Sequence, residues 1–330
     1  MFSSILNKFF KRKLKYLVVG AGSTGATFAC FLHSANKDVT LLSKYEDIVT
    51  GSKEKGGITL KSQVKGDKKY KINIQTEKTY KGKPDVIILC IRTPDILAAI
   101  PFIEKVSHKN TIVLSISNGF GIGYALQKRL KNNLILDANF VGKCRWFNRQ
   151  NMEYLQLREY CEFNFAPRSD ISNEILKTIE EDFTQAGMNT ACMSEKQFTE
   201  IAFERLITRS PFEACCLYYN ICAHDFIDEK YETFKTLCEE LLILAKAMGV
   251  KVRSEFLDEY FNNFEKYKER DDANVYSSIL NDMKYEQASE IDFLFFIVVE
   301  LAKEYNANLP TYFKIAEKFK ELNTLKSYLS

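Results

Sequence analysis

The segment YLVVGAGSTGATFACFLHSA, residues 16–35, restricts the possible fold more than any other part of this chain. Three glycines form a GxGxxG motif between an apolar run of strand type and an apolar run of helical type. In a strand–turn–helix unit, the first glycine allows the tight turn, the second lets a pyrophosphate approach the backbone, and the third lets the helix pack on the strand. The motif therefore predicts a dinucleotide site at the helix N-terminus, where free N–H groups favour anions. The residues expected to form it are Gly20, Ala21, Gly22, Ser23, Thr24 and Gly25; a tight packing turn is the alternative.

Short runs rich in β-branched residues alternate with helical patterns up to about residue 143. Several lack polar alternation, which is typical of parallel strands covered on both faces by crossover helices. Residues 145–193 give a mixed signal, with strands expected at YLQLREY, at CEFNF and before Met193, and a helix at SNEILKTIEEDFTQAG. From residue 194 the pattern is helical throughout. The expected strands of the first part are KYLVVGAG, KDVTLLSK, GGITLKS, KYKINIQ, PDVIILCI, NTIVLSISN and NLILDANF.

We therefore predict an α/β protein with an N-terminal Rossmann-type parallel-sheet domain over residues 14–193 and an all-helical C-terminal domain over residues 194–330. A length of 330 residues also favours two domains. Residues 1–13 are expected to be an extension, apolar and then basic, that frays before the first strand; a weak membrane-surface helix is the alternative.

The composition excludes several classes of protein. The net charge is only +3, with both signs interspersed and 46% hydrophobic residues, which gives no basis for a nucleic-acid partner. Nine scattered cysteines without a CxxC pair predict reduced, mostly buried thiols and a cytoplasmic protein, and the three histidines lack the spacing of metal ligands. The apolar run FLFFIVV is far shorter than the roughly 20 residues that span a bilayer, so we expect a buried helix and no integral membrane association.

The end of the second expected strand, VTLLSK, bears on the choice between NAD and NADP. NAD-binding proteins place an acidic residue there to bond the ribose hydroxyls. In this chain Ser43 and Lys44 occupy that position, and Arg92 follows the strand DVIILCI. A hydroxyl and cations suit a 2′-phosphate, so the sequence favours NADP, although each residue alone is more often a solvated surface group.

Five motifs, GAGSTG, VTLLSK, CIRTPD, SISNG and SSILNDMKYEQASEID, occur in an order and at spacings that resemble the ketopantoate reductase family. Enzymes of that family use NADPH to reduce 2-dehydropantoate to pantoate in pantothenate biosynthesis. The resemblance extends from about residue 14 to residue 320. The most specific part is the last motif, since family members typically read S-M-L-Q-D, a short spacer, and T-E-I-D.

The resemblance implies a Rossmann domain, a helical domain, and a cleft between them that holds nicotinamide and keto acid. It implies that Asn118 lies near nicotinamide and substrate, that Ser278 holds the substrate carboxylate, and that Glu290 contacts the ribose or the reacting hydroxyl. It also implies that Lys44 and Arg92 hold the 2′-phosphate.

Ser278 and Glu290 are twelve residues apart, which would place them about 120° apart on an unbroken helix. A break is therefore expected between them. Ser289 and Asp292 resemble a capping box, which predicts a new helix with Glu290 in its first turn. The alternative for Glu290 is a purely electrostatic role at the helix N-terminus.

The segment FERLITRSPFE departs from the family pattern W-x-K-L-x-x-N-x-x-x-N. Arg205 stands where the family has the lysine that polarises the ketone, and Arg209 and Glu213 stand where it has asparagines. Arg205 and Arg209 are one helical turn apart, and Glu213 is expected to pair with Arg209. Arginine stays protonated, so Arg205 is expected to stabilise an alkoxide but to be a poor proton donor. The proton would then come through water or from another group, and Glu290 is a candidate if its pKa is raised. Pro211 is expected to kink this helix.

These changes leave alternatives open. Two arginines could indicate a more anionic keto or imino acid, because the guanidinium binds carboxylates and phosphates bidentately. Arg205, Arg209 and Glu213 could instead form a structural ion-pair ladder, or the protein could be an NADP-binding regulator without catalysis. Phe295 and Phe296 replace the family's N-G, which predicts a repacked site. Trp146 is expected only to pack at the domain surface, and the protein is expected to form a homodimer.

Overall fold

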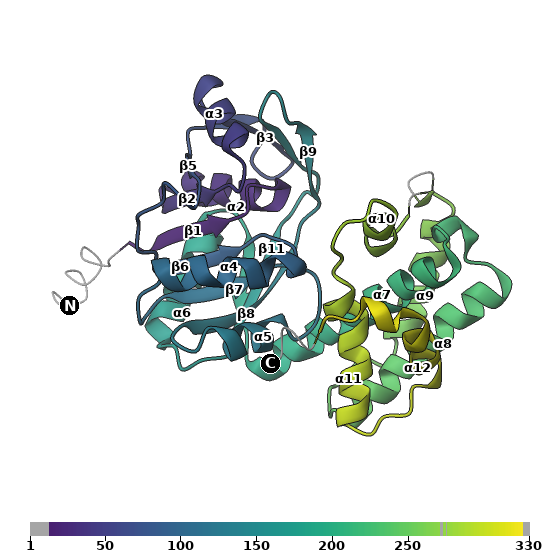
Figure 1. Cartoon of the computed structure of the whole chain (residues 1–330). Helices are drawn as coiled ribbons and strands as arrows, with labels where there is room; N and C mark the ends of the chain where they lie inside the picture. The colour runs from purple at the N-terminus through teal and green to yellow at the C-terminus, as the bar shows by residue number, and fades with distance from the viewer. Residues whose placement is uncertain (1–12, 271–272, 275, 326–330) are drawn as a thin grey trace. The chain divides into compact units, whose positions relative to one another are not determined.

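The computed structural model describes residues 13–270, 273–274 and 276–325, which form two compact units (Figure 1). Unit 1 holds the described residues up to Ile91 together with 99–117 and 130–192, and unit 2 holds 92–98, 118–129 and the described residues from 193 onward. The sequence predicted contiguous ranges, whereas two short segments that follow strands belong to unit 2. Residues 1–12, nearly all of the expected extension, lie outside the described part of the chain.

Unit 1 is built on an eight-stranded sheet in the order β12-β11-β8-β7-β6-β1-β2-β5. All neighbours in it are parallel except β8 and β11, which confirms the predicted Rossmann-type architecture. Its central strands are buried along nearly their whole length, as their unbroken apolar runs predict. The strands are β1 (Lys15–Val19), β2 (Asp38–Leu42), β5 (Asn73–Gln75), β6 (Val86–Leu89), β7 (Ile112–Ser115), β8 (Leu134–Val141), β11 (Glu162–Pro167) and β12 (Asn189–Cys192).

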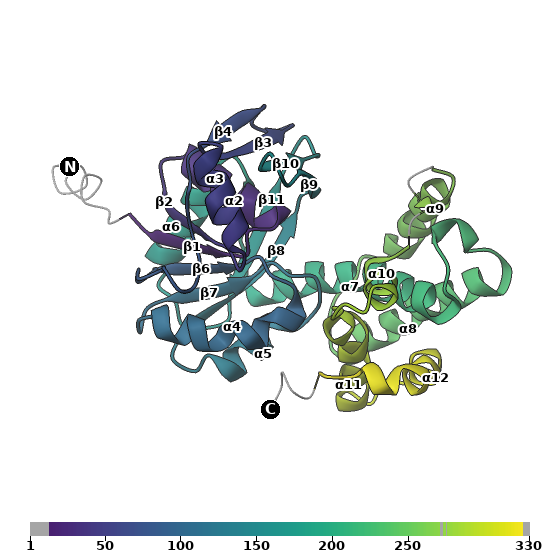
Figure 2. The same cartoon turned by 45° about the horizontal axis from the view of Figure 1, so that its top comes forward.

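A second, four-stranded sheet in the order β4-β3-β10-β9 completes unit 1 (Figure 2). It contains β3 (Ile58–Ser62), β4 (Lys68–Tyr70), β9 (Cys144–Asn148) and β10 (Glu153–Gln156). The segment KYKINIQ, predicted as one strand, is divided between β4 in this sheet and β5 in the main sheet. The strand β9 was not predicted, because its residues have no strong apolar alternation.

The helix α2 (Ser23–Ser34) packs against β1 and β2 of the main sheet and also against β9 and β10 of the second sheet. Every residue from Gly25 to Leu32 is buried for that reason, and Phe28 makes edge-to-face contacts with Phe140, Phe163 and Phe183. This packing on two sides holds the N-terminus of α2 at the end of β1. The other helices that begin before residue 193 are α3 (Glu46–Glu54), α4 (Thr93–Val106), α5 (Ile122–Arg129) and α6 (Asn173–Gln185).

The part of unit 2 from residue 193 onward is helical, as predicted. Its longest helix, α7 (Glu195–Tyr219), begins with a capping box between Ser194 and Gln197, continues past Pro211, and ends at Asn220 in the left-handed region. The helix α7 packs against α8, α10 and the π-helical turn. The remaining elements are α8 (Asp228–Ala247), α9 (Phe256–Lys268), α10 (Ser278–Lys284), a π-helical turn (Asp292–Phe296), α11 (Ile297–Glu304) and α12 (Pro310–Phe319), with short 3₁₀ turns at Ala223–Asp225 and Lys320–Leu322.

The run FLFFIVV is buried, as expected, in the π-helical turn and the start of α11. Phe295 stacks on Tyr312 in this core. None of the helices in the described residues has the length and apolar character needed to cross a membrane.

Candidate active site

The glycine loop joins β1 to α2 at the carboxyl end of the main sheet. β1 lies between β2 and β6, so the loop stands where the strand order reverses, which is the usual ligand site of such sheets. Gly20 has φ +106°, and a Cβ on it would lie 2.6 Å from the carbonyl oxygen of Cys90. A Cβ on Gly25 would lie 1.9 Å from the carbonyl oxygen of Gly20, so both glycines are required by backbone packing.

Gly22 differs from the other two glycines of the motif. A Cβ on Gly22 would meet no atom within 4 Å, and its φ of −73° is accessible to any residue. Packing of the protein therefore does not explain a glycine here. Open space directly at a helix N-terminus fits a pyrophosphate, because a Cβ would occupy the volume through which the phosphates approach the backbone N–H groups.

The second sheet braces the glycine loop. The Tyr154 hydroxyl donates to the carbonyl oxygen of Ala21 at 3.3 Å, and the Ser23 hydroxyl donates to that of Cys144 at 3.3 Å. The ring of Trp146 lies 4.0 Å, centroid to centroid, from that of Tyr154. Trp146 is thus a packing residue, as predicted, but it packs on a side chain that holds the loop. The sequence contained no local signal for Tyr154.

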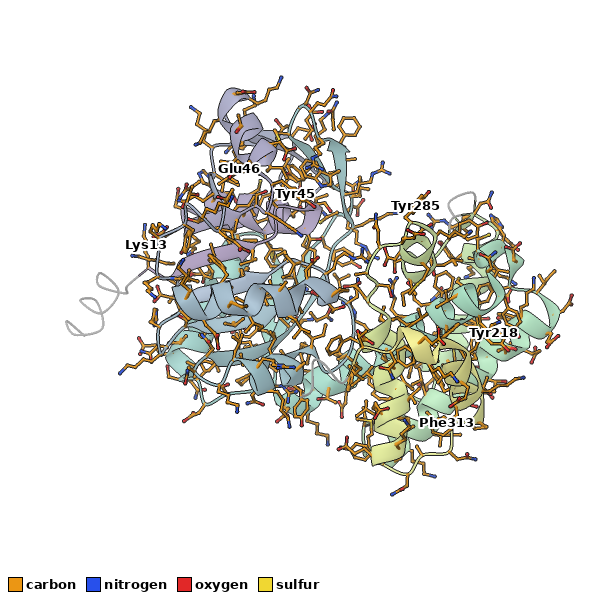
Figure 3. The ribbon with its side chains drawn as sticks, viewed as in Figure 1. Lys13, Tyr45, Glu46, Tyr218, Tyr285 and Phe313 are labelled. Carbon is orange, nitrogen blue, oxygen red and sulfur yellow. The ribbon has the colours of Figure 1, made fainter. Side chains whose placement is uncertain are left out.

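At the end of β2, Ser43 and Lys44 differ in exposure. The Ser43 side chain is buried, its hydroxyl donates to the Tyr45 carbonyl at 2.9 Å, and it accepts from the Tyr45 N–H at 3.0 Å. Ser43 thus shapes its own turn, and its hydroxyl does not face outward as the prediction for a phosphate ligand required. Lys44 is exposed. Tyr45, labelled at the start of α3 in Figure 3, is also exposed and has the Arg149 guanidinium 5.1 Å from its ring centroid.

Arg92 belongs to unit 2, where its guanidinium forms an ion pair with Asp282 of α10. The sequence predicted Arg92 as a ligand of a 2′-phosphate and did not anticipate this partner, which is 190 residues away. The side chain remains 39% exposed. Arg92 is therefore partly accessible, with Asp282 fixing one end of its guanidinium.

Glu290 lies in the interval between α10 and the next helix, so the predicted break between Ser278 and Glu290 is confirmed. The Glu290 side chain is buried and accepts hydrogen bonds from Asn118 Nδ2 at 3.3 Å and from the Thr93 N–H at 3.4 Å. Burial raises the pKa of this carboxyl; the bonds from Asn118 and Thr93, and the charges of Arg92 and Arg209, oppose the rise. Protonated Glu290 is thereby favoured relative to a solvated glutamic acid.

The predicted capping box around Glu290 does not form. The Ser289 hydroxyl accepts from the Ile291 N–H at 3.2 Å, whereas the Asp292 carboxylate accepts from the Thr324 N–H at 2.9 Å. The helix begins at Ile291, one residue after Glu290. Glu290 therefore precedes the first turn instead of lying within it, and Asp292 serves to hold the C-terminal segment.

Arg209, Glu213 and Ser278 form one hydrogen-bonded group. Glu213 is 1% exposed and accepts from Arg209 Nη2 at 3.0 Å, from the Ser278 hydroxyl at 2.7 Å and from the Ile279 N–H at 3.0 Å. The predicted pairing of Arg209 with Glu213 is thus confirmed. Arg205 lies one turn earlier on α7 and is partly buried.

Unit 2 therefore brings together most of the residues predicted to bind substrate or to act in catalysis. The charge of Arg209 acts on Glu290, and that of Glu213 acts on Asp282, so the two groups are electrostatic neighbours. The glycine loop and Lys44 belong to unit 1. The sequence indicated no role for Asp282 or Thr93, because their partners, Arg92 for Asp282 and Glu290 for Thr93, are far away in sequence. The described residues contain no cluster of metal-ligating side chains.

Comparison with known proteins agrees with this arrangement. The family model "Ketopantoate reductase PanE/ApbA" matches residues 16–150, and "Ketopantoate reductase PanE/ApbA C terminal" matches residues 197–323. The 2-dehydropantoate 2-reductase of Lactococcus lactis is 22% identical over 312 residues, which cover 90% of this chain and 94% of that protein.

Two solved structures show the same fold. The 2-dehydropantoate 2-reductase of Methylococcus capsulatus has a TM-score of 0.75 at 17% identity, covering 94% of this chain and 96% of its own. A D-mandelate dehydrogenase with NADH and anilino(oxo)acetate also has a TM-score of 0.75 at 17% identity, covering 96% and 100%. Because the two family models together match well over half of its length, the chain belongs to the ketopantoate reductase family, whose members are oxidoreductases that act on a CH–OH group.

Proposed function

We propose that this protein uses NADPH to reduce a 2-keto acid to the 2-hydroxy acid, with 2-dehydropantoate as the first candidate substrate and pantoate as its product. The family membership supports the reaction class. The observation that carries the proposal furthest is the buried Glu290, bonded to Asn118 and next to the arginines of unit 2, because it places a carboxyl whose pKa is raised by burial beside groups that bind anions.

The glycine loop is the part of the chain that would hold the cofactor pyrophosphate. The open volume at Gly22 fits it, and exposed Lys44 offers a cation for a 2′-phosphate at the position where an acidic residue would favour NAD. Arg92 offers a second cation, although Asp282 already neutralises it in part. When bound, the reduced nicotinamide supplies a hydride to the carbonyl carbon of the substrate.

The side chains of unit 2 would provide the rest of the reaction. Arg205 stands where the family has a lysine, and its guanidinium would hydrogen-bond the oxygen that becomes an alkoxide as hydride is added. Arginine does not release a proton near neutral pH, so the proton that converts the alkoxide to a hydroxyl would come from Glu290. The raised pKa of Glu290 supports this role because it favours the protonated acid.

The charges of unit 2 favour a substrate with one negative charge over a dicarboxylate. Arg92 is paired with Asp282 and Arg209 with Glu213, so the charges of these two arginines are already partly compensated before a substrate binds. A second carboxylate on the substrate would therefore meet little uncompensated positive charge at these two groups.

The test is steady-state consumption of NADPH by the full chain with 2-dehydropantoate, beside NADH as cofactor and 2-oxoglutarate as a dicarboxylate substrate. We expect turnover of 2-dehydropantoate with a preference for NADPH. Faster turnover of 2-oxoglutarate would support the more anionic substrate class instead. NADPH binding without any turnover would support a non-catalytic regulator and contradict the proposal.

A further inference from the structure

The carboxylate of Glu213 controls the hydrogen-bond direction of its neighbours. It is almost completely buried on α7 and accepts three hydrogen bonds, two at Oε1 from Arg209 and Ser278 and one at Oε2 from the Ile279 N–H. An ionised carboxylate has acceptor sites only, so each neighbour must donate to it. The ion pair with Arg209 stabilises that ionised form.

This arrangement leaves Ser278 with nothing to donate to a ligand. A serine hydroxyl has one hydrogen, and that of Ser278 is directed to Glu213 at 2.7 Å. Ser278 is exposed, so a ligand would meet only its oxygen lone pairs. A substrate carboxylate also has only lone pairs to offer, and two acceptors repel. The role in carboxylate binding that the family resemblance implies for Ser278 is therefore incompatible with this hydrogen-bond arrangement.

Arg209 has the complementary property. Its guanidinium has five N–H donors, of which one binds Glu213 and another, at Nε, is buried. The side chain is 40% exposed, and its remaining donors belong to the two terminal nitrogens. Glu213 fixes the orientation of the guanidinium, which reduces the entropy lost when the arginine binds a carboxylate. Arg209 and Ser278 are neighbours, because both donate to the same oxygen of Glu213.

We infer that the substrate carboxylate binds to Arg209, and that Ser278 accepts a hydrogen bond from a hydroxyl group of the substrate remote from that carboxylate. Glu213 acts as the positioning residue for both. The inference rests on the proposed function and makes it more specific by assigning the residues that bind the two ends of the substrate. An asparagine at position 213, as the family has, could donate as well as accept, so Glu213 is the residue that fixes the direction of these hydrogen bonds in this chain.

The experiment measures binding by titration calorimetry to the full chain, in the presence of oxidised NADP, with three probes. Pantoate has both the carboxylate and the remote hydroxyl. Its amide keeps the hydroxyl but lacks the charge, and 2-hydroxy-3,3-dimethylbutanoate keeps the charge but lacks the remote hydroxyl. Each probe is titrated into the unchanged protein and into Arg209→Gln, Ser278→Ala and Glu213→Gln.

Arg209→Gln is expected to weaken both acids on the order of 30-fold and to leave the amide unchanged, because a charge-assisted pair is lost. Ser278→Ala is expected to weaken pantoate and its amide about fivefold, while the acid without the remote hydroxyl keeps its affinity. Glu213→Gln should reduce the preference for pantoate over that acid, which a loss of stability alone would not do.

Three results would overturn the inference. The first is that Ser278→Ala weakens both acids equally, which would show that the Ser278 hydroxyl binds the substrate carboxylate. The second is that Arg209→Gln weakens the amide as much as the acids. The third is that the unchanged protein does not bind pantoate. Arg209→Lys, which keeps the charge and loses the fork, should give a smaller loss than Arg209→Gln if both variants fold. The expected binding pattern without reduction of 2-dehydropantoate would contradict only the proposed function.

Discussion

Substituting the second glycine of the loop, Gly22→Ala, gives the most direct test of where a cofactor binds. The structure predicts that this change leaves the fold intact, because the new Cβ has no atom within 4 Å and the backbone conformation suits alanine. The methyl group would point into the space assigned to the pyrophosphate. Displacing that group would cost about one charge-assisted hydrogen bond, on the order of 1.5–3 kcal/mol, which weakens NADPH binding roughly 10- to 100-fold.

Gly25→Ala is the matched comparison within the same motif. Its Cβ would lie 1.9 Å from the carbonyl oxygen of Gly20 and 3.2 Å from the Cys90 side chain, so the helix must move away from the strand. Overpacking of this kind costs about 1–3 kcal/mol, which lowers the Tm by roughly 1–4 °C in a protein of 330 residues. Gly25→Ala should therefore lose stability, whereas Gly22→Ala should lose affinity at an unchanged Tm.

The two variants are compared by thermal unfolding without cofactor and by the change in NADPH fluorescence during titration. A folded Gly22→Ala protein with the affinity of the unchanged protein would show that no pyrophosphate lies at Gly22. The cofactor assignment would then be refuted. A Tm for Gly22→Ala as low as that of Gly25→Ala would instead show that the volume at Gly22 is not open.

Three further changes test individual side chains. Lys44→Ala removes a cation from the 2′-phosphate, so it should raise the KM for NADPH roughly tenfold in steady-state assays and leave the KM for NADH unchanged. The control Lys53→Ala, on the exposed face of α3, should change neither KM. Tyr154→Phe should weaken NADPH binding about threefold to tenfold, because the glycine loop loses a hydrogen bond that holds it. The control Tyr160→Phe, at an exposed position, should leave NADPH binding unchanged. Equal effects of the two changes in a titration would show that Tyr154 does not hold the loop. Burial raises the pKa of Glu290, and the protonated form of Glu290 would be the proton donor, so kcat/KM for reduction should fall as pH rises through that pKa. Glu290→Gln should remove this pH dependence and slow turnover roughly 100-fold. An unchanged pH profile in the variant would exclude Glu290 as the acid.

Several local features of the site followed from the sequence because they depend on residues close together along the chain. The strand–turn–helix around the glycines, the i,i+4 pair of Arg209 and Glu213, and the interruption between Ser278 and Glu290 were all predicted and are present. Helical periodicity and turn geometry determine such features over a few residues. The capping box at Ser289 failed although its spacing was correct, because the Asp292 carboxylate binds Thr324 instead.

The sequence by itself determined the α/β class, the glycine turn and the helical character of the chain from residue 194, because these follow from periodicity and backbone sterics. Only the tertiary structure decided which groups the functional side chains contact. Tyr154 meets Ala21 across 133 residues, Asp282 meets Arg92 across 190, and Ser278 meets Glu213 across 65. A hydrogen bond depends on distances of about 3 Å and on direction, and no local pattern specifies either between distant segments. The direction of the Ser278 hydrogen bond, on which the proposed substrate selectivity depends, therefore became visible only in the folded chain.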